Sequence, residues 1–262
     1  MTWTPSPPRI DILITQLRAA GCVFAEDEAA LLVEAADDAE HLDALAARRV
    51  AGEPLEHLLG WVEFAGRRLP VRPGVFVPRR RSELLVREAV AAGGRIIVDM
   101  CCGAGAIGVS VAAALPDSTL WCCDLDPAAV DCAAEAIRQV GVNGRALVGD
   151  LDAPLPGDLA GRVDLLTANA PYVPRARIGM MPPEARDHEP LLALDGGADG
   201  LDLHRRIAAT APRWLRPGGH LLIETSDEQA EHTGSACAAA GLDPRIVSDP
   251  ELGATVVVAQ RH

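Results

Sequence analysis

A short apolar run that ends in a glycine-containing turn and continues as a helix is the feature that most constrains this chain. Residues 95–99 read Arg-Ile-Ile-Val-Asp, which is typical of a buried parallel strand. Gly103, Gly105 and Gly108 follow, and residues 106–115 have the composition of a helix. This order is typical of doubly wound α/β folds, whose ligands lie at the carboxyl ends of the strands. The sequence therefore predicts a ligand site at this turn.

The chain after residue 83 continues the alternation of strands and helices. Apolar runs are expected as strands at 119–123, 145–148, 163–168, 220–224, 244–247 and 254–259. Stretches with helical spacing are expected as helices at 84–92 and 127–139. Such alternation predicts an α/β domain with a doubly wound, mostly parallel sheet and helices on both faces.

The first part of the chain has a different pattern. Apolar residues recur at helical spacing through residues 9–51, and Gly52-Glu53-Pro54 ends that pattern. Residues 61–64 and 67–71 flank an Ala-Gly turn and are expected to pair as a hairpin. We therefore expect three regions: a small helical domain at 1–55, a β-hairpin linker at 56–82 and the α/β domain at 83–262.

Charge and composition exclude several classes of function. The 262 residues carry a net charge of −13, and all 24 basic residues are arginines. We expect no direct DNA binding, because basic side chains that neutralise phosphates dominate such affinity. The absence of lysine excludes Schiff-base chemistry. No apolar run reaches the roughly 18 residues of a membrane span and no signal sequence is recognised, so a cytoplasmic protein without membrane contact is expected.

The seven cysteines do not suggest a metal centre. They include two adjacent pairs, at 101–102 and 122–123, and no C-x-x-C spacing occurs. Structural zinc sites use characteristic spacings that this chain lacks. We expect reduced, buried thiols and no bound metal.

Two aspartates at predicted strand ends suggest a nucleoside site. Asp124 stands 19 residues after Gly105, where a carboxylate can accept hydrogen bonds from both ribose hydroxyls of an adenine nucleoside. Asp150 ends the next strand and can accept from the adenine amine, with Leu151 against the ring. The alternatives are a helix-capping aspartate at the first position and a turn aspartate at the second.

The identity of the nucleoside depends on the start of the loop. Gly103, Gly105 and Gly108 match the dinucleotide pattern G-x-G-x-x-G, which is a weak signal alone. Asp99 stands at the entrance of the loop, where a carboxylate suits a ligand with an ammonium and a sulfonium better than one with a pyrophosphate. The pattern therefore favours S-adenosylmethionine over NAD. An aspartate that only caps the loop is the alternative.

The segment Asn169-Ala170-Pro171-Tyr172 predicts chemistry on a planar nitrogen. The nitrogen of an amide or aromatic amine is a poor nucleophile, because its lone pair is delocalised. The Asn169 side-chain carbonyl and the Ala170 backbone carbonyl can hold its hydrogens and aim the lone pair at a methyl carbon. Tyr172 can stack on the planar group, and Pro171 stiffens the loop. An ordinary turn after a strand is the alternative.

Further motifs carry a resemblance that covers nearly the whole chain. They are Gly52-Glu53-Pro54-Leu55, Pro73-Gly74-Val75-Phe76-Val77-Pro78-Arg79, Glu189-Pro190-Leu191, Ala193-Leu194-Asp195-Gly196-Gly197 and Pro217-Gly218-Gly219-His220-Leu221-Leu222-Ile223-Glu224. With the Asn-Ala-Pro-Tyr segment, they resemble the protein-(glutamine-N5) methyltransferases of the HemK/PrmC type, which modify peptide chain release factors.

The resemblance implies a Rossmann-like class I methyltransferase fold with an antiparallel last strand. It also implies S-adenosylmethionine as donor, S-adenosylhomocysteine as product, and the glutamine amide of a release factor's Gly-Gly-Gln loop as acceptor. By position, the residues implied to bind the donor are Cys101, Cys102, Gly103, Ala104, Gly105, Asp124, Leu151 and Asn169. Residues 169–172 would hold the glutamine.

This sequence departs from the family pattern at three places. Ala170 replaces a proline, Cys101 replaces the first glycine of the donor loop, and Arg79-Arg80-Arg81-Ser82-Glu83 stands where the family has Arg-Pro-x-Thr-Glu. The fold and donor survive these changes, and a paralogue with another protein substrate is an alternative. The arginine run is either a solvated cluster or a contact for a partner protein or its RNA.

Three further functions remain open from the residues alone. The Asn-x-Pro-Tyr pattern also suits an N-methyltransferase for a small aromatic amine or for adenine N6. The second alternative is a donor-binding protein without turnover, and the third is a dehydrogenase.

Overall fold

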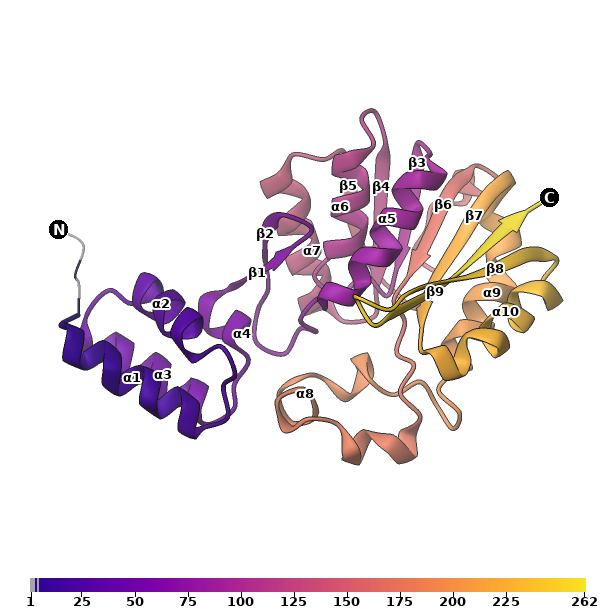
Figure 1. The fold of residues 1–262 in the computed structure, drawn as a ribbon. Coiled ribbons are helices and arrows are strands. Elements are labelled where there is room, and N and C mark those ends of the chain that lie inside the picture. Colours follow the sequence, from indigo (N-terminus) through magenta and orange to yellow (C-terminus); the bar gives the residue numbers. More distant parts are fainter. Residues whose placement is uncertain (1–2, 4) are drawn as a thin grey trace.

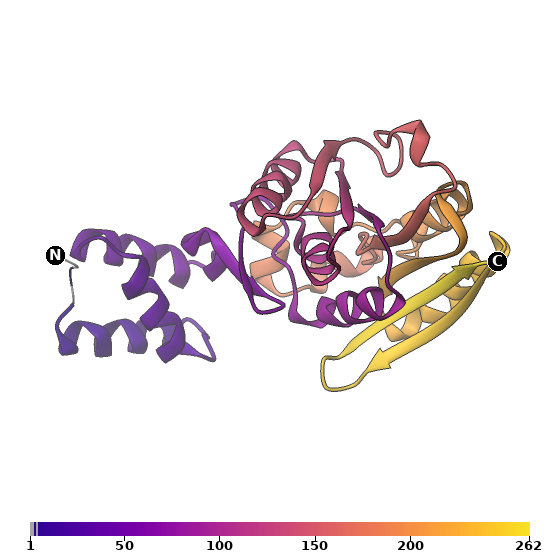
Figure 2. The same ribbon diagram turned by 90° about the horizontal axis from the view of Figure 1, so that it is seen from above.

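The computed structural model describes Trp3 and residues 5–262. The chain begins with a small helical bundle, which extends to one side of the remaining structure (Figures 1 and 2). Its helices are α1 (Pro7–Ala19), α2 (Ala25–Ala35), α3 (Ala39–Val50) and α4 (Leu55–Leu59). The bundle has a core of its own, which includes Leu13, Leu17, Leu32, Leu42 and Leu45. Its helices confirm the helical pattern expected over residues 9–51.

A hairpin connects the bundle to the sheet. Strands β1 (Trp61–Phe64) and β2 (Arg67–Pro70) pair antiparallel and confirm the predicted hairpin. The buried side chains of Val62, Phe64 and Leu69 belong to the core of the α/β domain. The linker is therefore packed on the domain that follows it. The boundaries at residues 55 and 82 stay a prediction, which the separate cores support.

The α/β domain is built on a seven-stranded sheet in the order β5-β4-β3-β6-β7-β9-β8. The strands are β3 (Ile96–Met100), β4 (Thr119–Asp124), β5 (Gly144–Val148), β6 (Val163–Ala168), β7 (Leu215–Thr225), β8 (Leu242–Asp249) and β9 (Ala254–Arg261). Strands β3 to β7 pair parallel, whereas β9 pairs antiparallel with both β7 and β8. The predicted mostly parallel sheet with an antiparallel last strand is confirmed.

Helices cover both faces of this sheet, because its central strands are apolar on both sides. They are α5 (Glu83–Ala92), α6 (Ala106–Ala114) and α7 (Pro127–Val140) on one face, and α9 (Asp202–Trp214) and α10 (Ala230–Ala239) on the other. Neighbouring residues of β3 show the alternation: Ile97 lies in the first core and Val98 in the second. The sequence predicted α5, α6 and α7, and made no prediction for α9 or α10.

The segment after β6 carries the most irregular structure. We call residues 174–195 the cover segment; it contains α8 (Pro183–His188) between two 3-10 helices, Arg175–Met180 and Leu191–Ala193. An isolated β-bridge pairs Val173, just before the segment, with Asp195 at its end, so the two ends of the segment lie side by side. In Figure 1 it lies between the helical bundle and the lower end of the sheet. Further 3-10 helices lie at Arg80–Ser82, Gly157–Leu159 and Asp227–Gln229.

Among Trp3 and residues 5–262, no helix is both long enough and apolar enough to cross a bilayer.

Candidate active site

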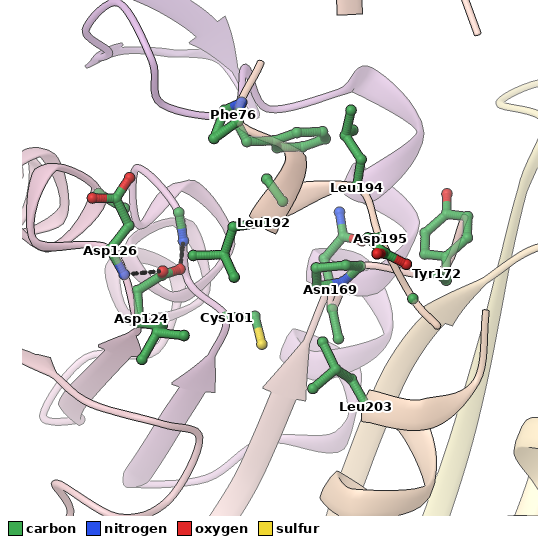
Figure 3. Close-up of a pocket in the computed structure, with 18 of the residues that line it drawn as sticks. Phe76, Cys101, Asp124, Asp126, Asn169, Tyr172, Leu192, Leu194, Asp195 and Leu203 are labelled. Atoms are coloured by element: carbon green, nitrogen blue, oxygen red, sulfur yellow. Dashed lines mark hydrogen bonds between the residues drawn. The ribbon is translucent and has the colours of Figure 1, made fainter. Parts of the chain in front are cut away.

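A cavity of about 600 Å³ lies at the carboxyl ends of the parallel strands (Figure 3). Its volume is in the range of pockets that bind small molecules. Eleven of the thirteen residues predicted for the site line it: Cys101, Cys102, Gly103, Ala104, Asp124, Asp150, Leu151, Asn169, Ala170, Pro171 and Tyr172. Asp99 and Gly105 do not. In Figure 3, Asp124 and Cys101 lie at one end, Tyr172 at the other and Asn169 between them. We call these the donor end and the acceptor end.

Asp124, the last residue of β4, is held in place by the main chain at the donor end. Its Oδ2 accepts from the N–H of Gly103 at 2.8 Å and its Oδ1 from the N–H of Asp126 at 3.0 Å (Figure 3). Burial raises the pKa of Asp124, whereas these two hydrogen bonds lower it. A carboxylate has about four acceptor positions. Asp124 therefore keeps acceptor positions for the hydroxyls of a ligand.

Two glycines of the loop between β3 and α6 have left-handed backbones for different reasons. Gly103 has a φ of 53°, and a Cβ built on it would meet nothing within 4 Å. Gly105 has a φ of 77° and begins α6; a Cβ there would stand 2.9 Å from the Cβ of Ala133 in α7. Gly103 thus leaves open space at the cavity, whereas Gly105 lets two helices approach each other. The donor-loop prediction for Gly105 corresponds in the structure to a packing position.

Asp99 lies beneath this loop. Its Oδ2 accepts from the N–H of Gly108 at 2.9 Å and its Oδ1 from the Thr167 hydroxyl at 2.8 Å. The side chain is 1% exposed, and burial raises the pKa of Asp99 to about 7 against the lowering effect of these two hydrogen bonds. Direct contact with a ligand, as predicted, would require this network to open. The geometry instead supports a role in fixing the start of α6.

Asp150 and Leu151 lie beside the donor end. Asp150 Oδ2 pairs with Arg206 Nη2 at 2.8 Å, and both side chains are about half exposed. Leu151 has a φ of 50° and is 6% exposed. Both line the cavity, and the contacts with an adenine predicted for them stay predictions.

Asn169 at the acceptor end has a fixed side-chain direction. Its Nδ2 donates to the Ser82 hydroxyl at 3.2 Å. Among Trp3 and residues 5–262, no hydrogen bond ends on Asn169 Oδ1 or on the carbonyl oxygen of Ala170. These are the two acceptors that the sequence predicted for a planar NH₂ group. Both residues line the cavity, and Ala170 is 1% exposed.

The Tyr172 hydroxyl lies near a buried carboxylate. Its hydroxyl lies 3.5 Å from Oε1 of Glu224, and Arg81 Nε donates to the same oxygen at 3.1 Å. The Arg81 guanidinium lies 5.8 Å from the centre of the Tyr172 ring. Burial and the neighbouring Glu224 raise the pKa of Tyr172 to about 12, so the phenol is neutral at physiological pH.

A second buried carboxylate, that of Glu189, joins the cover segment to residues 77–79. Glu189 Oε1 accepts from Arg79 Nη2 at 2.6 Å and from the N–H of Val77 at 3.3 Å. The arginine run is therefore more than a solvated cluster, because Arg79 and Arg81 pair with buried carboxylates of the chain itself. Arg80 is exposed. The sequence identified Glu189 and Glu224 only as parts of resembling motifs; a glutamate that ends the apolar run 221–223 was the available signal for a buried position.

Cys102, Cys122, Cys123, Cys132 and Cys237 are buried free thiols, as expected, whereas Cys22 and Cys101 are free thiols that are only partly buried. Within Trp3 and residues 5–262, no three His, Cys, Asp or Glu side chains gather in a way that could hold a metal ion.

Solved methyltransferase structures have a similar fold. A methyltransferase from Pyrococcus furiosus superposes with a TM-score of 0.57 at 14% identity, over 82% of this chain and 96% of that chain. A family model described as "Methyltransferase small domain" matches residues 68–179. This range includes the donor loop and the Asn169–Tyr172 segment.

Curated relatives extend the likeness over most of the sequence. A release factor glutamine methyltransferase from Gloeobacter violaceus is 44% identical over 71% of this chain, and this chain spans 66% of that protein's length. The one from Cereibacter sphaeroides is 37% identical over 82% of this chain and 76% of its own length. A 4-amino-L-phenylalanine/4-methylamino-L-phenylalanine methyltransferase from Streptomyces pristinaespiralis is 34% identical over 82% and 75%. The chain belongs to the release factor glutamine methyltransferase family.

Proposed function

We propose that this protein transfers a methyl group from S-adenosylmethionine to the side-chain amide nitrogen of a glutamine in a peptide chain release factor. The observation that carries the proposal is a pair of acceptor oxygens, Asn169 Oδ1 and the Ala170 carbonyl, which accept no hydrogen bond from the described residues and whose residues line one cavity with Asp124. The names of the curated relatives support the choice of acceptor. A release factor as partner implies a reaction in the cytoplasm.

The donor end fits an adenine nucleoside. Asp124 would accept from the ribose hydroxyls, and Gly103 leaves room at the backbone where a side chain would intrude. Cys101, Cys102 and Ala104 complete the wall of this end, and Leu151 offers an apolar surface for a ring. S-adenosylmethionine, when bound, would supply an electrophilic methyl group on a sulfonium.

The acceptor end would orient the amide nitrogen of the substrate glutamine. Asn169 and the Ala170 carbonyl would each accept one hydrogen of the glutamine NH₂, which holds the amide plane and directs the lone pair along the cavity. Tyr172 would lie against that plane. In the proposed transfer, the nitrogen would form the new N–C bond while the C–S bond of the donor would break and leave its electron pair on sulfur. The cationic amide would then release one proton to solvent, which leaves the neutral methylated amide and S-adenosylhomocysteine.

The helical bundle is proposed to dock the protein substrate. Arg49 of α3 lies 3.4 Å from Glu184 of the cover segment, so the bundle contacts the segment that borders the cavity. A protein bound across both would reach the acceptor end with a loop. The bundle, linker and α/β domain would then act as one binding surface.

The test is peptide mass spectrometry after incubation with S-adenosylmethionine and a release factor. We expect one added methyl on the glutamine of the Gly-Gly-Gln loop. The Asn169→Ala variant should lose the transfer, and a release factor with alanine at that glutamine should accept no methyl. Donor binding without any transfer to the release factor would contradict the proposed acceptor.

The Streptomyces pristinaespiralis relative favours one second candidate, the N-methylation of a small aromatic amine. An aromatic amine and an amide both present a planar NH₂ group, which the same two acceptors can hold. Incubation with 4-amino-L-phenylalanine in place of the release factor separates the two candidates. Faster transfer to the small amine would replace the first proposal with the second.

A further inference from the structure

The carbonyl oxygen of Tyr172 is held by a side chain that lies outside the cavity. Gln229 is 8% exposed and does not line the cavity. Its Nε2 donates to the Tyr172 carbonyl at 3.0 Å and to the Asp199 carbonyl at 3.0 Å, and its Oε1 accepts from the Ser226 hydroxyl at 2.8 Å. A side-chain amide has two hydrogens to donate, and both are used here. Because backbone carbonyls only accept, the NH₂ end of Gln229 must face them.

The glycine loop, which we define as residues 196–200, lies against Tyr172. A Cβ built on Gly196 would stand 2.7 Å from the Cα of Tyr172, and one built on Gly200 would stand 2.3 Å from the Tyr172 carbonyl oxygen. Residues without a side chain permit this close approach. Gln229 therefore joins two segments whose backbones are already in contact.

The residue after Tyr172 is fixed by other bonds. The N–H of Val173 donates to the Leu194 carbonyl at 3.1 Å, and the N–H of Gly196 donates to the Val173 carbonyl at 3.0 Å. Among the described residues, no group other than Gln229 donates to the Tyr172 carbonyl. Loss of the Gln229 hydrogens would leave this carbonyl without a partner.

We propose that Gln229 is a positioning residue that holds the backbone of the Asn169–Tyr172 segment in the shape that methyl transfer needs. Each residue has only two soft backbone dihedrals, and Val173 is fixed on one side. A Tyr172 carbonyl that leaves Gln229 would therefore displace the chain on its other side, which carries the Tyr172 ring and the Ala170 carbonyl. The proposal rests on the proposed function, because that segment is taken to hold the acceptor.

The first experiment needs neither donor nor acceptor. The chain contains a single tyrosine, so protein made with [1-¹³C]tyrosine carries one labelled carbonyl, that of Tyr172. Gln229→Met keeps the length of the side chain and removes both hydrogens. We expect the Tyr172 resonance to move upfield in this variant, because a hydrogen bond deshields the carbonyl carbon. A resonance at the wild-type position would overturn the proposal.

The second experiment measures transfer. Gln229→Met should lower kcat by about 10- to 100-fold, because a small displacement of a positioning group is costly even when the substitution is far from the chemistry. The affinity for S-adenosylhomocysteine should stay within about threefold, since the donor end does not depend on Gln229. An unchanged kcat, or an equal loss of donor affinity and kcat, would overturn the proposal.

Gln139→Met is the matched control. Gln139 Nε2 also donates to a backbone carbonyl, that of Arg68, at 2.9 Å, and neither residue lines the cavity. The substitution removes the same two hydrogens from a bond that joins α7 to β2. It should leave the Tyr172 resonance and kcat unchanged. A loss of transfer equal to that of Gln229→Met would show that the effect is not specific to Tyr172.

The wild type supplies a measurement that needs no variant. Of the four glutamines in the chain, Gln16, Gln139 and Gln260 are exposed. In protein with ¹⁵N-labelled glutamine side chains, one of the four NH₂ groups should exchange its hydrogens slowly, because both are bonded and buried. Four groups that exchange equally fast would overturn the proposal. If Gln229→Met does not fold, Gln229→Asn, whose NH₂ falls short of the two carbonyls, takes its place in both experiments.

The outcomes separate this proposal from the proposed function. A wild type that methylates no release factor, together with a Tyr172 resonance that moves in Gln229→Met, sinks the acceptor assignment and supports the hold of Gln229 on Tyr172. The comparison of kcat is then made with 4-amino-L-phenylalanine as acceptor. A wild type that methylates the release factor, with a resonance that does not move in Gln229→Met, sinks the role of Gln229 alone.

Discussion

The donor end and the acceptor end of the cavity are built in different ways. At the donor end, Asp124 is held by main-chain N–H groups at most 21 residues away along the chain. At the acceptor end, Asn169 is held by Ser82, 87 residues away, and Arg81 and Glu224 are 143 residues apart. A local loop thus shapes the donor end, whereas tertiary packing of side chains shapes the acceptor end. Substitutions at the two ends should therefore change different measured quantities.

The largest effect is expected from Tyr172→Ala. The substitution removes the surface proposed to lie against the acceptor plane and the contact with Glu224. We expect kcat to fall by about 10³-fold, because loss of orientation is costly when the nucleophile is weak. Donor affinity should stay within about threefold, measured by titration with S-adenosylhomocysteine.

Tyr172→Phe is the control for the ring itself. Phenylalanine keeps the plane and loses only the hydroxyl, whose distance to Glu224 is 3.5 Å. A loss of no more than about tenfold is expected from such a long contact. If Tyr172→Ala weakened donor binding as much as transfer, the two ends would not be separable.

Asp99, beneath the donor-end loop, should make the stability of the fold depend on pH. Because burial raises the pKa of Asp99 to about 7, the folded chain holds a proton that the unfolded chain has released above its ordinary value of 3.8. The folded state binds more protons in this window, so its stability falls as pH rises from about 4 to 7. Asp99→Asn should remove this loss and gain about 2–3 kcal/mol on the wild type between pH 5 and pH 8.

Urea unfolding at the two pH values measures the gain. The asparagine can satisfy both partners: its oxygen accepts from the N–H of Gly108, and its NH₂ donates to Thr167, whose hydroxyl also lies 3.4 Å from the Val98 carbonyl. An equal pH dependence in both proteins would show that Asp99 is ionised in the folded state. In that case its predicted contact with a cationic ligand would regain support.

Asp124→Ala tests the donor end, as Tyr172→Ala tests the acceptor end. It removes the acceptor proposed for the ribose hydroxyls, and hydrogen bonds to a charged group contribute about 2 kcal/mol. We expect the affinity for S-adenosylhomocysteine to fall by about 30-fold and kcat at saturating donor to change by less than about threefold. A fall in kcat with unchanged affinity would contradict the division between the two ends.

The same division explains what the sequence could predict. The strand, the glycine turn and Asp124 form a local pattern, so the donor end could be located from Gly103 and Asp124 alone. The strand positions followed in the same way from apolar runs, and all seven strands of the sheet lie where they were expected within a few residues. Asn169 to Tyr172 could be predicted because the residue types fit a chemical task, and the structure places them on the cavity wall; their role stays a prediction.

The support behind the acceptor end could not be predicted. Whether Glu224 is buried, and against which side chain, depends on how β7 lies beside β6 and on where tertiary packing places Arg81. Arg81 looked like part of a charged surface because its buried partner is far away in sequence. Asp99 was predicted at the cavity wall, whereas the pleat turns its side chain beneath the loop, since neighbouring residues of a strand face opposite sides.

The smallest effect is expected at Cys101, and it separates backbone strain from packing. Cys101 and Leu151 both have left-handed backbones, with φ of 54° and 50°, and both line the cavity. This conformation costs a residue with a Cβ about 1 kcal/mol. Cys101 is partly exposed, so Cys101→Gly should raise the free energy of unfolding by up to about 1 kcal/mol. The greater entropy of glycine in the unfolded chain reduces this gain.

Leu151 is buried, so Leu151→Gly should lower the free energy of unfolding, because lost packing of about 2 kcal/mol or more exceeds the relieved strain. Urea unfolding of both variants measures the two signs. Equal signs would show that the loop at Cys101 is held by its side chain, and the donor end would then depend on tertiary packing as the acceptor end does.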